Sequence, residues 1–268
     1  CNDYLPIAMS KARVVIAEIN MNVPWVYQDV PFDEELVTLA IESDDPVASY
    51  KPLRPGAVET QIARNIAGRI EDGATIQYGI GGIPPAVFEA LEGHRDLGLH
   101  SGLVSDEAIA LIQAGVITNA RKPIHKGKSI GALAFGGEKF KNFAHVNPHF
   151  EMHQSTSTHG AATLSQITNL VSINSALEVD LFGQVNAEQI GTKYLGAIGG
   201  QIDFMHAAST HQGGLSIIAM PASLGKSGRG RITDKLAGPL VTTARADVDL
   251  VITEFGIADL RGKTLHGR

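Results

Sequence analysis

Residues 72–87 read DGATIQYGIGGIPPAV, and the order of residue types in this stretch is that of a strand, a tight turn and a helix. The apolar and β-branched side chains within 74–79 favour a strand. Three glycines among the four positions 79–82 then let the backbone turn where a side chain would obstruct it. Pro84 stands at the expected start of a helix over 84–92, where its missing N–H costs no hydrogen bond. The stretch therefore predicts one strand–turn–helix unit.

Apolar runs alternate with segments of helical period along the rest of the chain. We expect further strands at 13–19, 129–135, 170–174, 214–219 and 249–253, and further helices at 59–71 and 105–114. Ile62, Ile66 and Ile70 recur every four residues, which places them on one face of the first of these helices. Ser105 is the expected N-cap of the second. This alternation predicts an α/β fold with an open, mostly parallel sheet flanked by helices.

The composition excludes several classes of protein and site. The chain has 268 residues and a net charge of −6, so its overall charge gives no field that would attract nucleic acid. Cys1 is the only cysteine, which rules out an intramolecular disulfide and a cluster of thiolate metal ligands. No apolar run approaches the roughly 20 residues that cross a bilayer. We therefore expect a cytoplasmic protein that contacts neither nucleic acid nor membrane.

The glycine turn at 79–82 suits anion binding and tight packing about equally well. A strand-to-helix turn can present backbone amides and a helix N-terminus to an anion. The turn is not a dinucleotide fingerprint, because Pro84 stands where the third glycine would fall. Residues 225–227, Gly-Lys-Ser, do not form a phosphate loop either, because Met220 holds the upstream glycine position.

Several longer stretches resemble one enzyme family. Residues 96–106 read DLGLHSGLVSD, residues 172–186 read SINSALEVDLFGQVN, and residues 196–204 read GAIGGQIDF. Together with GIGGIP at 79–84, they resemble the acetyl-CoA hydrolase/transferase family. The blocks at 225–232 and 251–263 resemble the last segments of the same family, so the resemblance covers nearly the whole chain.

The resemblance implies a CoA-transferase-like fold and a specific chemistry. In the family, a glutamate carboxylate attacks an acyl-CoA thioester and then carries CoA as a glutamyl thioester. CoA thereby moves between acyl-CoA and short-chain carboxylic acids such as acetate, butyrate or 4-hydroxybutyrate. Coenzyme A is a substrate in this reaction, and no tightly bound cofactor is expected. Gly102 occupies the position of the nucleophilic glutamate in this chain.

The family's two glycine-rich walls imply the residues that contact CoA and the reacting carbonyl. Backbone amides in these walls would form an oxyanion hole, and a basic side chain would meet the CoA phosphates. The expected residues are Gly79, Ile80, Gly81, Gly82, Ile83, Asn174, Gly199, Gly200 and Lys226.

Gly102 leaves three functions open. The chain can belong to a CoA-transferase, to a catalytically impaired protein that binds acyl-CoA or serves as an assembly subunit, or to a weak acyl-CoA hydrolase. The last follows because space vacated by a side chain can admit water. Asp106 and Glu107 are the nearest carboxylates in sequence, but neither is required to face the site.

The resemblance also divides the chain into domains. Residues 1–30 are expected to be the end of a truncated first CoA-transferase domain, and residues 59–268 the second domain. Residues 31–58 contain four prolines and little periodicity, so we interpret them as the connecting segment. Missing first-domain strands would expose apolar surface, and we expect a homo-oligomer or a complementing domain to cover it.

Other polar residues are expected to have structural roles. Glu178 and Asp180 are interpreted as capping or ion-pairing groups rather than catalysts. Ser101 lacks the G-x-S-x-G pattern of serine hydrolases and is expected to shape its loop. Histidines 145, 149 and 153 recur every four residues, but the proline at 148 interrupts any helix that would align them, so no metal site is predicted.

Overall fold

The computed structural model describes residues 2–49, 54–211, 213–225 and 228–267. Its centre is a nine-stranded sheet of order β18-β17-β13-β8-β4-β5-β6-β7-β2, in which every neighbouring pair is parallel except β17 with β18. The strands are β2 (Tyr27–Gln28), β4 (Thr75–Tyr78), β5 (Gly98–Ser105), β6 (Ser129–Phe135), β7 (Phe150–Met152), β8 (Leu170–Asn174), β13 (Leu215–Ala219), β17 (Leu250–Thr253) and β18 (Gly256–Asp259). The prediction of an open, mostly parallel sheet is confirmed.

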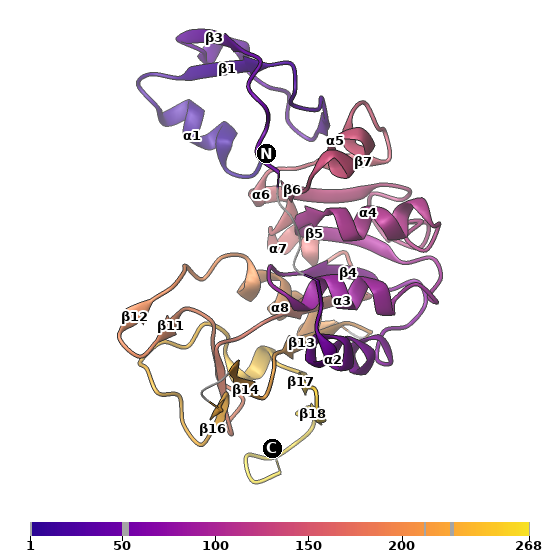
Figure 1. The fold of residues 1–268 in the computed structure, drawn as a ribbon, viewed down its shortest axis with the longest axis vertical. Coiled ribbons are helices and arrows are strands. Elements are labelled where there is room, and N and C mark those ends of the chain that lie inside the picture. Colours follow the sequence, from indigo (N-terminus) through magenta and orange to yellow (C-terminus); the bar gives the residue numbers. More distant parts are fainter. Residues whose placement is uncertain (1, 50–53, 212, 226–227, 268) are drawn as a thin grey trace.

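Helices cover both faces of this sheet (Figure 1). On one face, α2 (Ala57–Ala67), α3 (Ile83–Ala90), α4 (Asp106–Gln113) and α5 (Glu138–Ala144) share a core with Val171 and Ile173 of β8. Leu170 of β8 belongs instead to a cluster with α7 (Ala161–Leu164) and α8 (Gln201–Thr210). Because alternate residues of a strand point to opposite faces, these two helix groups lie on opposite sides of the sheet. None of the helices in the described ranges has the length and apolar character needed to span a membrane.

Two smaller parts flank the main sheet (Figure 1). At one end, α1 (Leu5–Lys11) lies near a parallel pair formed by β1 (Ile16–Asn20) and β3 (Leu39–Ser43), with the 3-10 turn η1 (Glu34–Leu36) between these strands in sequence. At the other end lie the short strands that follow β8. These are β9 (Glu178–Asp180), β10 (Val185–Asn186), β11 (Gln189–Ile190), β12 (Lys193–Tyr194), β14 (Ser223–Leu224), β15 (Arg229–Gly230) and β16 (Ile232–Thr233), with η3 (Arg245–Asp247).

Each predicted strand and helix has an observed counterpart, with some corrections. The predicted strands correspond to β1, β4, β6, β8, β13 and β17, and the bounds of β6 and β8 agree with the prediction. Helix α2 ends at Ala67 instead of residue 71, because Gly68 closes its last turn, although Ile70 remains buried. Ser105 does precede α4, but its hydroxyl does not cap the helix. It contacts the hydroxyl of Tyr78 at 3.1 Å instead.

Two strands were not predicted. Strand β5 was not expected, because the glycines, histidine and serines within 98–105 are not typical of a strand; it is a strand because it is buried between β4 and β6. Residues 31–58, interpreted as a connecting segment, contain β3. Leu39 of β3 pairs with Ile16 of β1, and this long-range pairing is not visible in local sequence.

Candidate functional site

A cavity of about 1020 Å³ opens at the carboxyl ends of β4 and β8 and beside the middle of β5. Strands β5, β6 and β7 continue from β4 toward one edge of the sheet, whereas β8, β13 and β17 continue toward the other. The chain therefore reverses direction beside β4, and such a switch point is where open parallel sheets bind ligands. Tyr78, Gly102 and Asn174 bring the three strands to the cavity wall.

The structure brings most of the predicted site residues to this cavity. Those that line it are Gly79, Ile80, Gly102, Asn174, Gly199 and Gly200. Gly81, Gly82 and Ile83 are not among the lining residues, and Ile83 is buried at the start of α3. Lys226 lies outside the described residues. The predicted set is thus split between the cavity itself and the turn at its rim.

The first glycine wall is held close to β8. A Cβ on Gly79 would lie 2.9 Å from Oδ1 of Asn174, so a side chain at position 79 would displace the Asn174 amide from its place. The N–H of Gly79 donates to the carbonyl of Ile173 at 2.9 Å and is therefore already used in the sheet. Within the described residues, no acceptor meets the N–H groups of Ile80, Gly81 or Gly82. The amides available to a ligand are those after Gly79, rather than that of Gly79 itself.

The cavity wall beside Gly79 is a buried amide and hydroxyl network. The Nδ2 of Asn174 donates to Oε1 of Gln77 and to Oγ of Ser172, both at 3.0 Å. Ser172 in turn donates to the same Gln77 oxygen at 2.6 Å. Because these polar groups satisfy one another, Asn174 is positioned by its neighbours and shapes the cavity wall.

The second glycine wall leads into α8. Gly199 has a φ of +61°, a left-handed conformation that favours glycine, and Gly200 is the N-cap of the helix. Gln201, Asp203 and Phe204 from the first turn of α8 also line the cavity. The N-terminal end of this helix therefore points its partial positive charge toward the cavity.

Ser101 holds open the place where β4 and β5 separate. The two strands pair only through residues 75–76 and 98–99. Farther on, the hydroxyl of Ser101 donates to the carbonyl of Tyr78 at 3.2 Å and accepts from its N–H at 3.4 Å. Ser101 thus lies in a strand, not in a loop, and its side chain bridges a gap that begins next to Gly102.

His159, which sequence reasoning missed, fills the space in front of Gly102. A Cβ on Gly102 would lie 2.8 Å from Nε2 of His159 and 3.7 Å from Cε2 of Phe204. A Cβ on Gly200 would collide with the same imidazole. His159 directly follows the short helix α6 (Ser155–Thr158), and no recognisable motif surrounds it in sequence.

The electrostatic setting keeps this imidazole neutral near neutral pH. Burial lowers the pKa of His159 below its ordinary value of 6.5, while the carboxylates of Asp203 and Asp3 oppose that shift. His100 is more deeply buried, and burial together with the nearby Lys122 ammonium lowers its pKa to about 3. Both rings are therefore available as neutral hydrogen-bonding groups.

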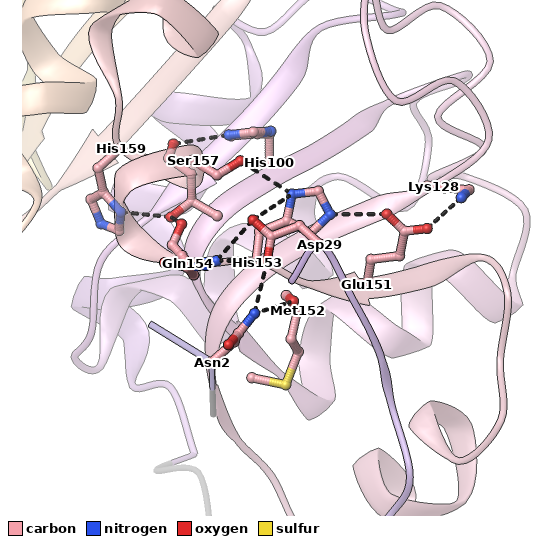
Figure 2. A network of polar contacts seen from close by, with 11 residues as sticks. Asn2, Asp29, His100, Lys128, Glu151, Met152, His153, Gln154, Ser157 and His159 are labelled. Atoms are coloured by element: carbon pink, nitrogen blue, oxygen red, sulfur yellow. Dashed lines mark hydrogen bonds and ion pairs between the residues drawn. The ribbon is translucent and has the colours of Figure 1, made fainter. Parts of the chain in front are cut away.

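A polar network continues behind His159 (Figure 2). His153 bonds Oε2 of Glu151 through Nε2 at 2.9 Å and contacts the Ser157 hydroxyl through Nδ1 at 3.5 Å. Glu151 is also ion-paired with Lys128. His159 and His100 lie at the other end of the drawn network.

The histidines that lie close together in the structure are not those that recur every four residues in the sequence. His145 Nδ1 accepts from the N–H of Trp25, and His149 contacts the carbonyl of Gly127, so they do not join His153. Instead, His125, Glu151 and His153 place one ligand atom each within 4.8 Å of one another, a geometry that could hold a metal ion. Since Glu151 is already bonded to Lys128 and His153, a metal would have to displace those contacts.

The other acidic residues considered from sequence hold backbone groups. Glu178 accepts from the N–H of Ala237 at 2.8 Å, and Asp180 accepts from the N–H of Gln184 at 2.9 Å. Asp106 accepts from the N–H of Gly137 at 2.9 Å and does not line the cavity. These contacts are the structural roles expected of such carboxylates.

Comparison with known proteins gives the family of this chain. Residues 136–268 match the model of the acetyl-CoA hydrolase/transferase C-terminal domain. The chain is 41% identical to the 4-hydroxybutyrate coenzyme A transferase of Clostridium kluyveri over 268 residues. The aligned region covers all of this chain and 62% of that protein. The chain belongs to the acetyl-CoA hydrolase/transferase family.

Further members of this family resemble the chain in sequence and in structure. The succinyl-CoA:cyclohexane-1-carboxylate CoA transferase of Geobacter metallireducens is 38% identical over 269 residues, which are 99% of this chain and 61% of that one. The crystal structure of 4-hydroxybutyrate CoA-transferase from Porphyromonas gingivalis superimposes with a TM-score of 0.87 and 37% identity, over 99% of this chain and 63% of that one. The chain thus spans less than two thirds of the length of these relatives.

For a member of this family, the groups around Gly102 decide which chemistry is available. In the described part of the chain, the cavity is lined by one imidazole, His159, one guanidinium, Arg231, and two carboxylates, Asp3 and Asp203. Arg231 belongs to the basic block predicted at 225–232. It donates through Nε to the carbonyl of Leu177 at 3.0 Å, which anchors its stem at the wall.

Proposed function

We propose that the protein binds CoA thioesters of short-chain carboxylic acids in this cavity and belongs to an enzyme that moves CoA between such acids. The observation that carries the proposal is the cavity itself, which has a glycine-rich wall on each side and lies at the carboxyl ends of parallel strands. The sequence identity of 41% with a 4-hydroxybutyrate CoA transferase supports acetate, butyrate or 4-hydroxybutyrate as acids of suitable size.

The backbone of the cavity suits a reacting thioester. The amides of Ile80 in the cavity wall and of Gly81 and Gly82 at its rim have no acceptor among the described residues, and the N-terminus of α8 approaches from the other wall. Fixed amides of this kind stabilise the oxyanion of a tetrahedral intermediate by about 3 to 4 kcal/mol per donor. Arg231 is the cavity cation that would meet a CoA phosphate, and we propose the same role for Lys226. Coenzyme A acts here as a substrate.

Gly102 favours a second candidate function. Transfer through a glutamyl thioester requires a carboxylate, and Gly102 has no side chain to supply one. Loss of a covalent nucleophile commonly lowers turnover by several orders of magnitude while binding remains. The alternative is therefore an acyl-CoA-binding or assembly subunit without transferase turnover.

Two measurements separate these functions. Calorimetry with CoA and with acetyl-CoA measures binding, and a steady-state assay measures acetate-dependent transfer from butyryl-CoA. Binding with robust transfer supports the transferase. Binding without transfer supports the non-catalytic subunit, and absence of CoA binding contradicts both.

We also propose the assembly in which this site works. Residues 59–268 would form the second CoA-transferase domain, residues 1–30 the end of the first, and residues 31–58 their connection. Ile16, Ile19 and Met21 are large apolar side chains that are exposed in this chain. A homo-oligomer or a complementing domain would cover them. The single cysteine supports the expectation of a reducing, cytoplasmic setting.

A further inference from the structure

The imidazole of His159 lies between two glycines from different elements. Gly102 is on β5, and Gly200 is the residue before α8. A Cβ at either position would contact the ring edge that carries Nε2. The ring can therefore occupy this place only because both positions lack a side chain, and its Nε2 edge lies beside Gly102.

Hydrogen bonds determine which ring nitrogen carries the proton. The hydroxyl of Thr158 donates its only hydrogen to the carbonyl of Gln154 at 3.2 Å. The same hydroxyl lies 2.7 Å from Nδ1 of His159. We infer the tautomer in which Thr158 accepts from Nδ1–H, so that Nε2 keeps a lone pair on the side of Gly102. A base oriented in this way by a third group is the usual arrangement for activating a nucleophile.

The charges around the ring suit proton uptake during a reaction. Burial favours the neutral ring, whereas Asp203 of α8 and Asp3 would stabilise the imidazolium once it forms. His100 of β5 is the neighbouring titratable group; its Nε2 bonds the carbonyl of Thr158 at 3.0 Å, and it stays neutral because its pKa is about 3 (Figure 2). Thr158 itself is fully buried between the two histidines.

We propose that His159 is a general base that activates water for hydrolysis of the bound acyl-CoA thioester. This inference rests on the proposed binding of CoA thioesters in the same cavity. Water would lie in the cavity within reach of Nε2 of His159, so that water accepts the acyl group in place of a carboxylate of the protein. The role assigned to Thr158 is to position the ring rather than to touch the substrate.

The reaction balances without any further reactant. The water oxygen bonds to the thioester carbonyl carbon, its proton moves to Nε2 of His159, and the carbonyl electron pair moves onto oxygen. The oxyanion is stabilised by the glycine-wall amides. When it collapses, the carbon–sulfur bond breaks and the proton on Nε2 passes to the CoA sulfur. The products are the free carboxylic acid and the CoA thiol.

The first test compares variants of the full chain in a free-thiol assay with acetyl-CoA and no acceptor acid. We expect His159→Asn to lower kcat by at least about 100-fold, while calorimetry still detects CoA binding. His206→Asn is the matched control, because His206 is exposed on α8 and pairs with Asp247 outside the cavity. Equal thiol release by His159→Asn and the unsubstituted protein would overturn the inference.

Thr158 offers a test of positioning. Thr158→Val keeps the buried shape but removes the acceptor for Nδ1–H, so we expect a lower kcat and a pH profile whose midpoint moves to lower pH. Thr158→Ser restores the hydroxyl and should restore both. A loss in the valine variant that serine does not rescue, or that leaves the pH profile unchanged, contradicts the assigned role.

A single turnover in water labelled with the heavy oxygen isotope identifies the nucleophile. Direct attack by water puts the label into the acid released in the first turnover. An unlabelled acid in the first turnover shows attack by a carboxylate of the protein and overturns the inference. If acetyl-CoA binds but no thiol is released, the inference fails while the proposed CoA site stands. If CoA does not bind, the proposed function itself fails.

Discussion

His159 Nε2 lies 2.8 Å from the point that a Cβ of residue 102 would occupy, so the imidazole and a side chain at position 102 exclude each other as the chain is now arranged. This relationship links the missing carboxylate to a histidine distant in sequence. It also predicts how the site responds when the carboxylate is supplied.

Gly102→Glu should displace His159 and change the reaction. We expect a loss of about 1 to 3 kcal/mol in the free energy of unfolding from overpacking. We also expect acetate-dependent CoA transfer to appear and a CoA adduct of the protein to be detected by mass spectrometry. Adding His159→Ala should relieve the overlap and recover stability. Absence of transfer in both the single and the double variant would contradict a nucleophile position at residue 102.

Gly79→Ala should destabilise the junction of β4 and β8. The new Cβ would lie 2.9 Å from Oδ1 of Asn174, which is held by Gln77 and Ser172. We expect a loss of about 1 to 3 kcal/mol in urea unfolding. Gly93→Ala is the control, because no atom lies within 4 Å of its added Cβ. Similar stabilities for the two variants would show that the Asn174 amide can move away at no cost.

Thiol release should depend on pH through the neutral form of His159. Burial lowers its pKa below 6.5, so the rate should be level above that pH and should fall as pH decreases through the lowered value. Asp203→Asn removes a carboxylate that raises this pKa and should move the midpoint to still lower pH. If Asp203→Asn left the midpoint unchanged, the group that titrates would not be an imidazole influenced by the Asp203 carboxylate.

Folding stability should decrease in acid because His100 is buried as a neutral ring. Its pKa is about 3 in the folded protein and 6.5 when exposed, so below pH 6.5 the unfolded chain binds a proton that the folded chain excludes. The resulting loss of folding stability is absent above pH 6.5 and grows by about 1.4 kcal/mol per pH unit as the pH falls toward 3. Urea unfolding of His100→Gln should show a flatter pH dependence. An unchanged slope would contradict the buried neutral ring.

Arg231→Gln should weaken the binding of CoA by about tenfold if its guanidinium meets a phosphate. Acetyl-pantetheine lacks the nucleotide phosphates, so its affinity should change little. Arg261→Gln is the control, because Arg261 pairs with Asp259 and does not line the cavity. Equal losses for CoA and for acetyl-pantetheine would mean that Arg231 supports the wall through Leu177 rather than binding phosphate.

Local patterns predicted much of the fold. The contiguous apolar runs of β6 and β8 had the expected bounds, and the proline pair at 84–85 stands in the first turn of α3 as expected. Strand β5 escaped prediction because its glycines, histidine and serine become strand residues only when neighbours bury them on both sides. Strand β3 escaped because its partner β1 is distant in sequence.

The sequence by itself determined the α/β alternation, the family resemblance and the absence of a side chain at position 102, since each follows from the identity and spacing of neighbouring residues. Only the tertiary structure decided what replaces that side chain. His159 reaches Gly102 because β5, α6 and the glycines before α8 pack together, and such contacts depend on the three-dimensional arrangement of segments that share no local pattern.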